Sequence, residues 1–511
     1  MSLQKLDCPV AKWLGWSLLA VAIGLALSHL LEMRTLWMDE AMLALNYTNR
    51  GWFDLLRPLG MGQVAPIGYL YLSKAAFHLL PGYVGLRLVS FCAYLASIFF
   101  LWRGLQWGNW GSASGQTSPA PLITATFAAT PILMRYSNEV KQYMFDALAW
   151  TVAFAALMAL LHGAAQLKRR DHTFLLAAMG PALLWLSNTS VFVLAAWGAT
   201  WIGHLITSKP DNATDQRTTW LRTLFIFGNW ALFFVAYYAA FIHNHPAKEF
   251  MLEFWSAQNA FMPLSISEWL PWLLQSFEAM LQFSVKMSPS KWALIAVGLG
   301  LLWGAWSARH RLRSNWIPLF FILPPALHLL ASALEMYPFH SRLAIWHVPG
   351  MVVMAGLALT LADQTRFRRH LSTSLLTLLT LAFLGINTQL PSDADDFSDS
   401  LQYLDNRPEA NLIIHFSHNP SYRFHRRLWE NLRERPFVTI GAWGGERLDE
   451  IPSLVEDLPE QAHYLGPLNG EWKPYKLPDA AFRAALDSNG FALEEVVSSD
   501  NVKLFRIVKQ P

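Results

Sequence analysis

The sequence has few charged residues and almost no cysteine. Of its 511 residues only 15% are charged, against about 25% in an ordinary soluble domain. This deficit argues against a soluble enzyme. The two cysteines are Cys8, near the N-terminus, and Cys92, inside an apolar run. A disulfide between them would have to reach membrane depth, so we expect none.

The few charges are unevenly distributed. Residues 390–511 hold 20 acidic and 13 basic side chains, whereas residues 1–389 hold 16 acidic and 26 basic ones. The first region is therefore only about 11% charged, as in a membrane domain. We predict a transmembrane domain over 1–389 and a separate domain over 390–511. The basic residues lie in short loops rather than on one face, which argues against a nucleic-acid partner.

Apolar windows of about 20 residues predict about eleven transmembrane helices. The runs near 173 and 191 are short, so they form either two helices or one re-entrant element. The first run resembles a signal peptide at residues 26–28, but it is long enough to span a bilayer, which favours a membrane helix. The runs begin near Trp13, Val84, Pro119, Tyr143, Thr173, Val191, Leu221, Lys291, Trp316, Arg342 and Leu371.

Basic loops predict the orientation of these helices. Clusters at 168–170, 209–222, 309–313 and 366–369 fall on one side, which places the N-terminus in the cytoplasm and the tail outside. The outside segments then include two long loops, 32–83 and 243–290. Their aromatic residues indicate either amphipathic helices at the interface or simple aromatic-belt anchoring. The first loop also holds cations that require an anionic partner: Arg34, Arg50, Arg57 and Lys74.

The tail alternates strand-like and helix-like runs, which predicts a small extracytoplasmic α/β domain. The expected strands are 412–416, 437–440 and 463–465, followed by a hairpin of 491–497 and 502–507. The expected helices are 422–432 and 480–487.

Polar clusters that could carry chemistry all fall on the predicted outer side, where they could line one cavity. Asp39 and Glu40 follow the first membrane helix, and a dehydrated Asp there could act as a general base. Residues 63–69 precede Arg87, and two further clusters span 135–143 and 337–342. The simpler readings are a solvated carboxylate pair, arginines that extend to the interface and a local salt-bridged turn.

The order of these motifs resembles the integral-membrane glycosyltransferases of the C-type fold. The branch that matches is that of the bacterial relatives of protein mannosyltransferases and of the aminoarabinose transferase that modifies lipid A. The resemblance rests on Trp37-x-Asp39-Glu40, a Pro-containing segment before Arg87, residues 136–143, and Tyr337-Pro338 followed by Arg342.

The resemblance implies an inverting transfer of a sugar from a polyprenyl-phosphate donor to a periplasmic acceptor. It implies that Asp39 lies at the reaction centre with Glu40 supporting it. The residues that match the family's phosphate-binding positions are Arg87, Lys141, Tyr143, Tyr337 and Arg342. One departure concerns the acceptor, because the lipid A enzymes have Glu-Lys-Pro-Pro where residues 63–66 read Gln-Val-Ala-Pro.

The chemistry requires such residues, since departure of a lipid phosphate develops negative charge that fixed cations stabilise. Arg can bind phosphate through two parallel donors, which favours Arg87 and Arg342 over Lys141 as phosphate clamps. Glu139 is expected near the acceptor or behind the catalytic groups. His243 and His245 are weak candidates for a divalent cation, because a third and a fourth ligand are not apparent. No cofactor is assigned.

We therefore predict a polytopic α-helical glycosyltransferase of the bacterial inner membrane, in contact with membrane lipid. A transporter or flippase for a lipid-linked sugar is an alternative, disfavoured by the lack of an internal repeat. A ligase or polymerase of surface polysaccharide is another. The sequence does not distinguish the sugar, the acceptor or the oligomeric state.

Overall fold

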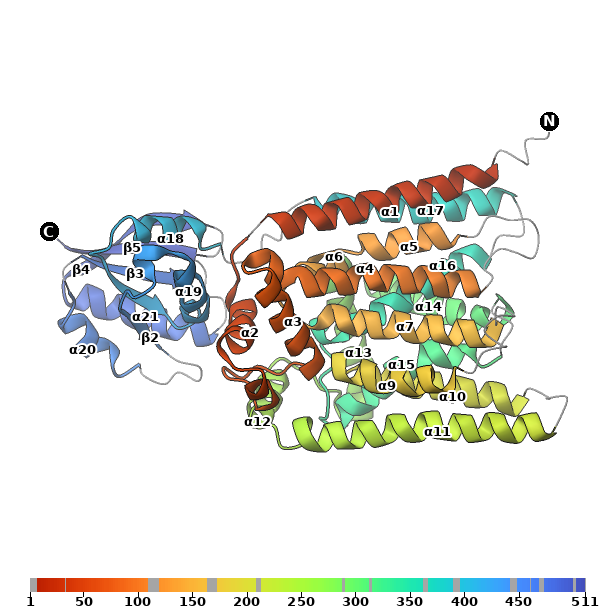
Figure 1. The fold of residues 1–511 in the computed structure, drawn as a ribbon. Helices are drawn as coiled ribbons and strands as arrows, with labels where there is room; N and C mark the ends of the chain where they lie inside the picture. Colours follow the sequence, from red (N-terminus) through yellow and green to blue (C-terminus); the bar gives the residue numbers. More distant parts are fainter. Residues whose placement is uncertain are drawn as a thin grey trace. The chain divides into compact units, whose positions relative to one another are not determined.

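In a computed structural model, the chain forms two compact units (Figure 1). The first unit comprises Met1–Leu31, Trp52–Leu79 and Arg87–Gln389, and the second comprises Glu32–Gly51, Leu80–Leu86 and Leu390–Pro511. The residues that the structure describes are 7–32, 34–108, 119–162, 172–207, 213–286, 290–311, 315–361, 366–388, 396–441, 448–459, 461–467, 473–499 and 502–510.

The first unit is a bundle of apolar helices whose long members run alongside one another (Figure 1). Within the described ranges, eight segments are long and apolar enough to cross a membrane. Three shorter apolar helices, α5, α9 and α15, lie where the sequence predicts the other three spans. The chain is a multi-pass membrane protein, and the total of eleven spans stays a prediction. The helices of the bundle are α1 (Asp7–Leu31), α4 (Tyr83–Trp107), α5 (Ala120–Ala129), α7 (Tyr143–His162), α9 (Thr173–Leu186), α10 (Ser190–Thr207), α11 (Ala213–Tyr237), α14 (Lys291–Arg311), α15 (Ile317–Ala333), α16 (Val348–Leu361) and α17 (Arg366–Asn387).

The run from 173 to 207 forms two helices rather than one re-entrant element. A Ser-Asn-Thr turn at 187–189 separates α9 from α10. The Ser187 backbone N–H bonds the Leu183 carbonyl (2.8 Å), which closes the last turn of α9. Helix α9 therefore ends, and helix α10 begins, next to hydrogen-bonded polar residues inside the first unit.

The further helices of the first unit lie between the spans or form the ends of spans. They are the 3-10 helix η2 (Phe53–Leu56), α3 (Ile67–Leu79), α6 (Pro131–Ser137), the π-helix η4 (Tyr238–Ile242), α12 (Lys248–Ser256), α13 (Ile266–Val285) and the 3-10 helix η5 (Ser341–His347). Both long loops predicted outside thus contain helices. Helix α13 buries Trp272 and exposes Ile266 and Leu270, the two-sided pattern expected of a helix at a membrane interface.

The second unit contains a five-stranded mixed sheet in the order β2-β1-β3-β5-β4. Strands β2, β1 and β3 are parallel, and β5 pairs antiparallel with both β3 and β4. The sheet confirms all five strands expected from the alternating pattern. The strands are β1 (Asn411–His415), β2 (Phe437–Ile440), β3 (Ala462–Pro467), β4 (Phe491–Ser499) and β5 (Val502–Lys509). The turn expected between β4 and β5, at 499–501, lies largely outside the described residues.

Helices cover both faces of this sheet, because successive side chains of a strand point to opposite faces. Leu412 and Ile414 pack with Phe397, which directly precedes α18 (Ser398–Asp405). Ile413, between them, packs with Phe482 of α21 on the other face. The helices of this unit are α2 (Met38–Asn49), α18 (Ser398–Asp405), α19 (Asn419–His425), α20 (Ile451–Glu456) and α21 (Lys473–Ser488).

The helix expected over 422–432 is wrong in its second half. Helix α19 ends at His425, and two 3-10 turns follow, η6 (Arg426–Leu428) and η7 (Glu430–Leu432). Trp429 between them is extended (φ −118°, ψ 126°). Arg426 donates to the Arg435 carbonyl (2.9 Å) and stacks on Phe437. These tertiary contacts override the helical propensity of the segment.

A glycine allows close packing between α14 and α16, which contact each other. A Cβ at Gly304 would overlap the backbone carbonyl of Met354, whereas a Cβ at Gly298 in the same helix would meet nothing within 4 Å. Small residues permit such backbone approach in membrane bundles.

We expect Gly304→Ala to destabilise the folded protein by about 1–3 kcal/mol, because the added methyl overpacks the helix pair. The control Gly298→Ala should be neutral or slightly stabilising, since Ala is the better helix former. Thermal unfolding of both variants in detergent tests this. Equal midpoints would show that the close approach is not required.

Candidate active site

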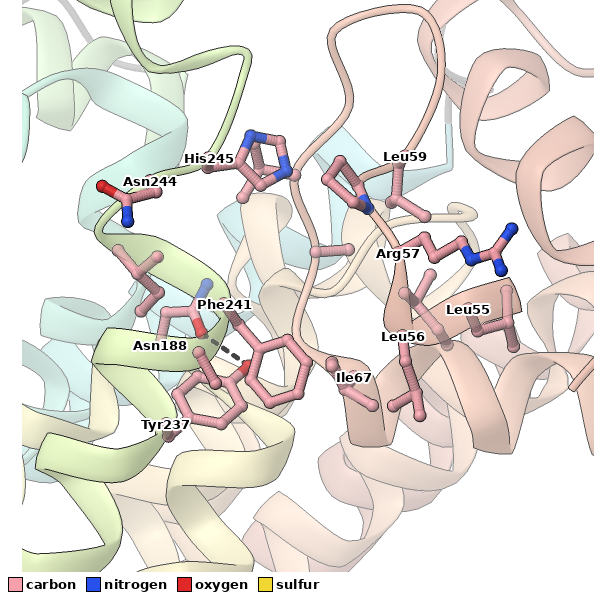
Figure 2. Close-up of a pocket in the computed structure, with 16 residues that line it drawn as sticks. Leu55, Leu56, Arg57, Leu59, Ile67, Asn188, Tyr237, Phe241, Asn244 and His245 are labelled. Atoms are coloured by element: carbon pink, nitrogen blue, oxygen red, sulfur yellow. Dashed lines mark hydrogen bonds between the residues drawn. The ribbon is translucent and has the colours of Figure 1, made fainter. Parts of the chain in front are cut away.

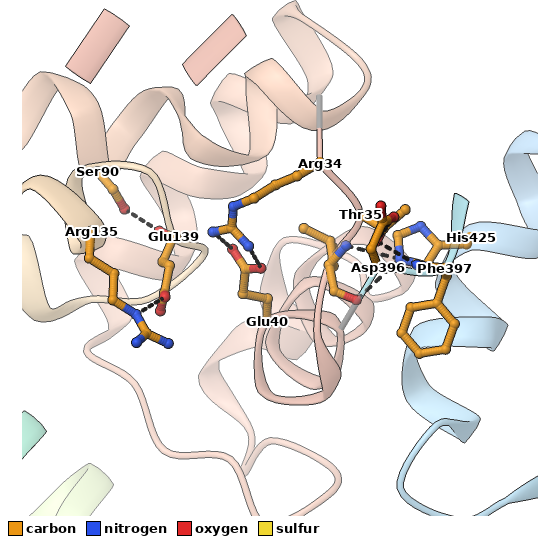
Figure 3. A network of polar contacts seen from close by, with 10 residues as sticks. Arg34, Thr35, Glu40, Ser90, Arg135, Glu139, Asp396, Phe397 and His425 are labelled. Atoms are coloured by element: carbon orange, nitrogen blue, oxygen red, sulfur yellow. Dashed lines mark hydrogen bonds and ion pairs between the residues drawn. The ribbon is translucent and has the colours of Figure 1, made fainter. Parts of the chain in front are cut away.

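The Asp39–Glu40 pair lies in the first turn of α2, in the second unit. Glu40 is fully buried, and Arg34 binds its carboxylate through both terminal nitrogens (3.2 and 3.5 Å; Figure 3). Asp39 is only partly exposed. The anionic partner of Arg34 is therefore a carboxylate of the same loop. Arg57, in the first unit, likewise pairs with Asp54 (3.6 Å).

In the first unit, the turn at 138–142 holds two of the predicted residues. Lys141 is buried, and its Nζ donates to the Gln63 side-chain oxygen (2.9 Å). Glu139 is buried and ion-paired with Arg135 of α6 (2.7 Å; Figure 3). Ser90 of α4 donates to the backbone carbonyls of Glu139 (2.9 Å) and Lys141 (3.1 Å). Ser90 therefore fixes the backbone that carries the side chains of Glu139 and Lys141.

Arg87 lies one turn before Ser90 in α4 and is fully buried. It does not extend to an interface, so the structure contradicts the simpler reading of this arginine.

Gln142 donates to the Val64 carbonyl (3.3 Å). The segment 63–66 and the turn 138–142 are therefore joined by two hydrogen bonds, although they are 78 positions apart in the sequence.

Tyr143 and Tyr337 are accompanied by a carboxylate that the sequence analysis did not single out. Asp146 of α7 is buried and accepts a hydrogen bond from Ser187 (2.6 Å). Burial raises the pKa of the Tyr337 hydroxyl, and the nearby Asp146 and Tyr143 raise it further. Tyr337 therefore stays protonated and able to donate. The sequence does contain a signal for Asp146, because an ionisable residue within an apolar run indicates a functional position.

Arg342, in η5, stacks on an aromatic residue. Its guanidinium lies 5.3 Å from the ring centre of Trp255 in α12, and the same ring contacts His340 (5.0 Å). Burial lowers the pKa of His340 to about 4, and the positive charge of Arg342 contributes to the decrease. His340 is therefore neutral at pH 7, which leaves Arg342 as the cation of this pair.

A cavity of about 90 Å³ lies in the first unit (Figure 2). Its wall includes Val64 and Ala65, which directly follow Gln63, and Asn188, which directly follows Ser187. Tyr237 donates to Asn188 (3.3 Å) at the start of the π-helix η4. Such helical irregularities are frequent at functional sites. The cavity is mainly apolar, and Arg57 and His245 add polar groups to its wall.

Comparisons with known proteins give a structural answer only. No family model and no curated protein matches the chain. Among solved structures, ArnT from Cupriavidus metallidurans bound to undecaprenyl phosphate is 14% identical, covers 96% of this chain and 97% of its own, and has a TM-score of 0.54. The Archaeoglobus fulgidus oligosaccharyltransferase in complex with Zn and sulfate is 11% identical, covers 96% of this chain and 72% of its own, and has a TM-score of 0.52.

The chain has the C-type glycosyltransferase fold. This confirms the resemblance at the level of the fold.

The archaeal structure is a complex with Zn and sulfate, and the two histidines that the sequence suggests as weak metal ligands lie in the first unit here. His245 lines the cavity and accepts the Ala247 N–H at Nδ1 (3.2 Å). His243 packs on Tyr238. In the described part of the chain, no group of three or more His, Cys, Asp or Glu side chains is placed to hold a metal.

We expect Ser90→Ala to destabilise the protein by about 1–3 kcal/mol, because the buried Lys141 carbonyl loses the Ser90 donor and the Glu139 carbonyl keeps only the Lys141 N–H. Ser97→Ala is a matched control, since Ser97 is equally buried in α4 but bonds only the Ala93 carbonyl of its own helix (2.7 Å). The helix already satisfies that carbonyl, so the control should cost less. Chemical unfolding in detergent measures both. A larger loss for Ser97→Ala would contradict this account of the turn.

Proposed function

We propose that the protein is a glycosyltransferase that moves a sugar from a polyprenyl-phosphate donor to an acceptor on the periplasmic side of the bacterial inner membrane. The observation that carries the proposal is a set of two buried cations and one buried carboxylate, Arg87, Lys141 and Glu139, on a C-type glycosyltransferase fold. Ionisable groups in a membrane bundle are costly and mark substrate sites. ArnT, similar along 96% of this chain, was solved with undecaprenyl phosphate.

In the proposed reaction, Asp39 accepts the proton of the acceptor hydroxyl while the hydroxyl oxygen bonds to the anomeric carbon. The bond from that carbon to the phosphate oxygen breaks, and its electron pair stays on the phosphate. Attack from the opposite face inverts the anomeric configuration. Arg87, Arg342 and Lys141 stabilise the negative charge that develops on the phosphate. Tyr143 and Tyr337 donate hydrogen bonds to it.

The contact between Gln63 and Lys141 supports the proposed role of Lys141. Gln63 accepts a hydrogen bond from the Lys141 ammonium group through its amide oxygen, which orients that group without adding a negative charge at position 63. In a low-dielectric site, a carboxylate at position 63 would change the local charge and so have a large effect on anion binding. The apolar cavity beside Gln63 is suited to the first isoprene units of the carrier.

We expect Gln63→Glu to raise the KM for the donor about tenfold or more, because the new carboxylate neutralises Lys141. Gln63→Leu removes the hydrogen bond but leaves the charge of Lys141, so its effect should be smaller. Sugar transfer by purified protein in lipid, at varied donor concentration, measures both. An equal loss in the two variants would show that packing at position 63, rather than charge, matters.

Asp39→Asn should remove turnover while the protein stays folded and still binds polyprenyl phosphate. Asn keeps the size of Asp but cannot accept the proton, and loss of a positioned base usually costs roughly 100- to 10,000-fold in rate. The assay uses a panel of polyprenyl-phosphate sugars. Transfer by Asp39→Asn at the parental rate would refute the mechanism. Movement of a lipid-linked sugar across the bilayer without any glycosylated product would favour a flippase.

Cysteine labelling tests the proposed orientation. In a variant lacking Cys8 and Cys92, single cysteines replace the exposed residues Gln216 and Ser453. We expect a membrane-impermeant maleimide to label position 453 in cells with a permeabilised outer membrane. Position 216 should react only after the inner membrane is dissolved, because basic loops stay in the cytoplasm. The reverse pattern would invert the topology and place the site in the cytoplasm.

A further inference from the structure

The segment that carries Asp39 belongs to the same compact unit as the C-terminal domain. Helix α19 of that domain packs against α2, whose first turn holds Asp39. The last residue of α19, His425, is fully buried. Its Nε2 lies 3.0 Å from the Leu36 backbone nitrogen and 3.2 Å from the Leu36 carbonyl oxygen, three residues before Asp39.

The His425 ring bonds the Leu36 backbone in either neutral tautomer. With the proton on Nδ1, Nε2 accepts the Leu36 N–H. With the proton on Nε2, the ring donates to the Leu36 carbonyl. The other ring nitrogen lies 2.7 Å from the Tyr83 hydroxyl, which can donate or accept as the tautomer requires. Tyr83 thus fixes the orientation of the ring, and the ring fixes Leu36.

Further contacts hold the segment on both sides of Asp39. Thr35 accepts the Phe397 backbone N–H (3.0 Å) and donates to Asp396 (3.3 Å). At the other end of α2, Arg427 donates to the Asn49 side chain. The C-terminal domain therefore binds residues immediately before Asp39 and the last residue of its helix. A carboxylate between two such attachments has little freedom to move.

We propose that His425 is a positioning residue, which holds the Leu36 backbone so that Asp39 is placed to take the acceptor's proton. The inference rests on the proposed role of Asp39. It assigns to the C-terminal domain a part in the reaction besides any contact with the acceptor. Displacement of a catalytic group by about 1 Å can cost on the order of 100-fold in rate, so a backbone contact three residues away is sufficient to control turnover.

The test compares three variants by steady-state kinetics with a polyprenyl-phosphate sugar. His425→Ala removes both bonds, and we expect kcat to fall roughly 10- to 100-fold while the donor KM stays within about twofold of the parent. His425→Gln keeps an amide that can reach Leu36 and should recover most of kcat. The matched control is His463→Ala, in β3 of the same unit. His463 is also buried, and its Nδ1 bonds the Gln461 carbonyl (2.9 Å).

Hydrogen exchange gives a readout that needs no activity. The Leu36 amide should exchange faster in His425→Ala than in the parent, and so should the amides of residues 34–49. They should be unchanged in His463→Ala. If His425→Ala does not fold, Tyr83→Phe replaces it, because this variant removes the hydroxyl that orients the His425 ring and leaves the ring in place. The fall in kcat and the rise in exchange should then be smaller but in the same direction.

The outcomes separate this inference from the proposed function. If the parent transfers no sugar but exchange at residues 34–49 rises in His425→Ala, the attachment stands and the proposed function fails. If the parent transfers sugar and His425→Ala retains its kcat, or exchange is unchanged, the positioning role is refuted. A rise in KM without a fall in kcat would also refute it, because it would place His425 in donor binding.

Discussion

Buried charge in an apolar helical bundle is the constraint on which the site depends. A charged or polar group in such surroundings must find a partner or pay a desolvation penalty of several kcal/mol. The first unit meets this requirement by joining segments far apart in the chain: Gln63 to Lys141, Ser90 to the turn at 138–142, and Ser187 to Asp146. The same contacts that satisfy the charges also fix their positions.

Polar contacts also explain where the helices break. Helix α9 ends at Ser187, whose backbone N–H bonds the Leu183 carbonyl and whose hydroxyl bonds Asp146 of α7 across the bundle. His328, inside α15, bonds the Pro338 carbonyl (3.1 Å) and His347 (3.0 Å). Asn229, inside α11, donates to the Ala177 carbonyl (2.6 Å). Both polar side chains are therefore hydrogen-bonded inside apolar helices.

The sequence was informative where one physical requirement acts along the chain. Bilayer thickness sets the length of apolar runs, and the pleat of a sheet sets the alternation in strands such as 411–415. The sequence was uninformative where the two residues that contact each other lie far apart in the chain. No spacing rule joins Gln63 to Lys141, and the end of α19 at His425 depends on contacts of Arg426 with Arg435 and Phe437. Asp146 was overlooked because a single carboxylate barely changes the hydropathy of α7.

The discontinuous make-up of the second unit has a consequence for biosynthesis. Leu36 and His425 are 389 positions apart, and a ribosome adds about 5–20 residues per second. Roughly 20 to 80 s therefore pass between synthesis of the Asp39 segment and arrival of the α19 residues that bind it. Throughout that interval, the nascent chain lacks the contacts that hold Asp39 in place. A prematurely terminated chain would insert its helices yet stay without a finished loop, so only the complete polypeptide becomes competent.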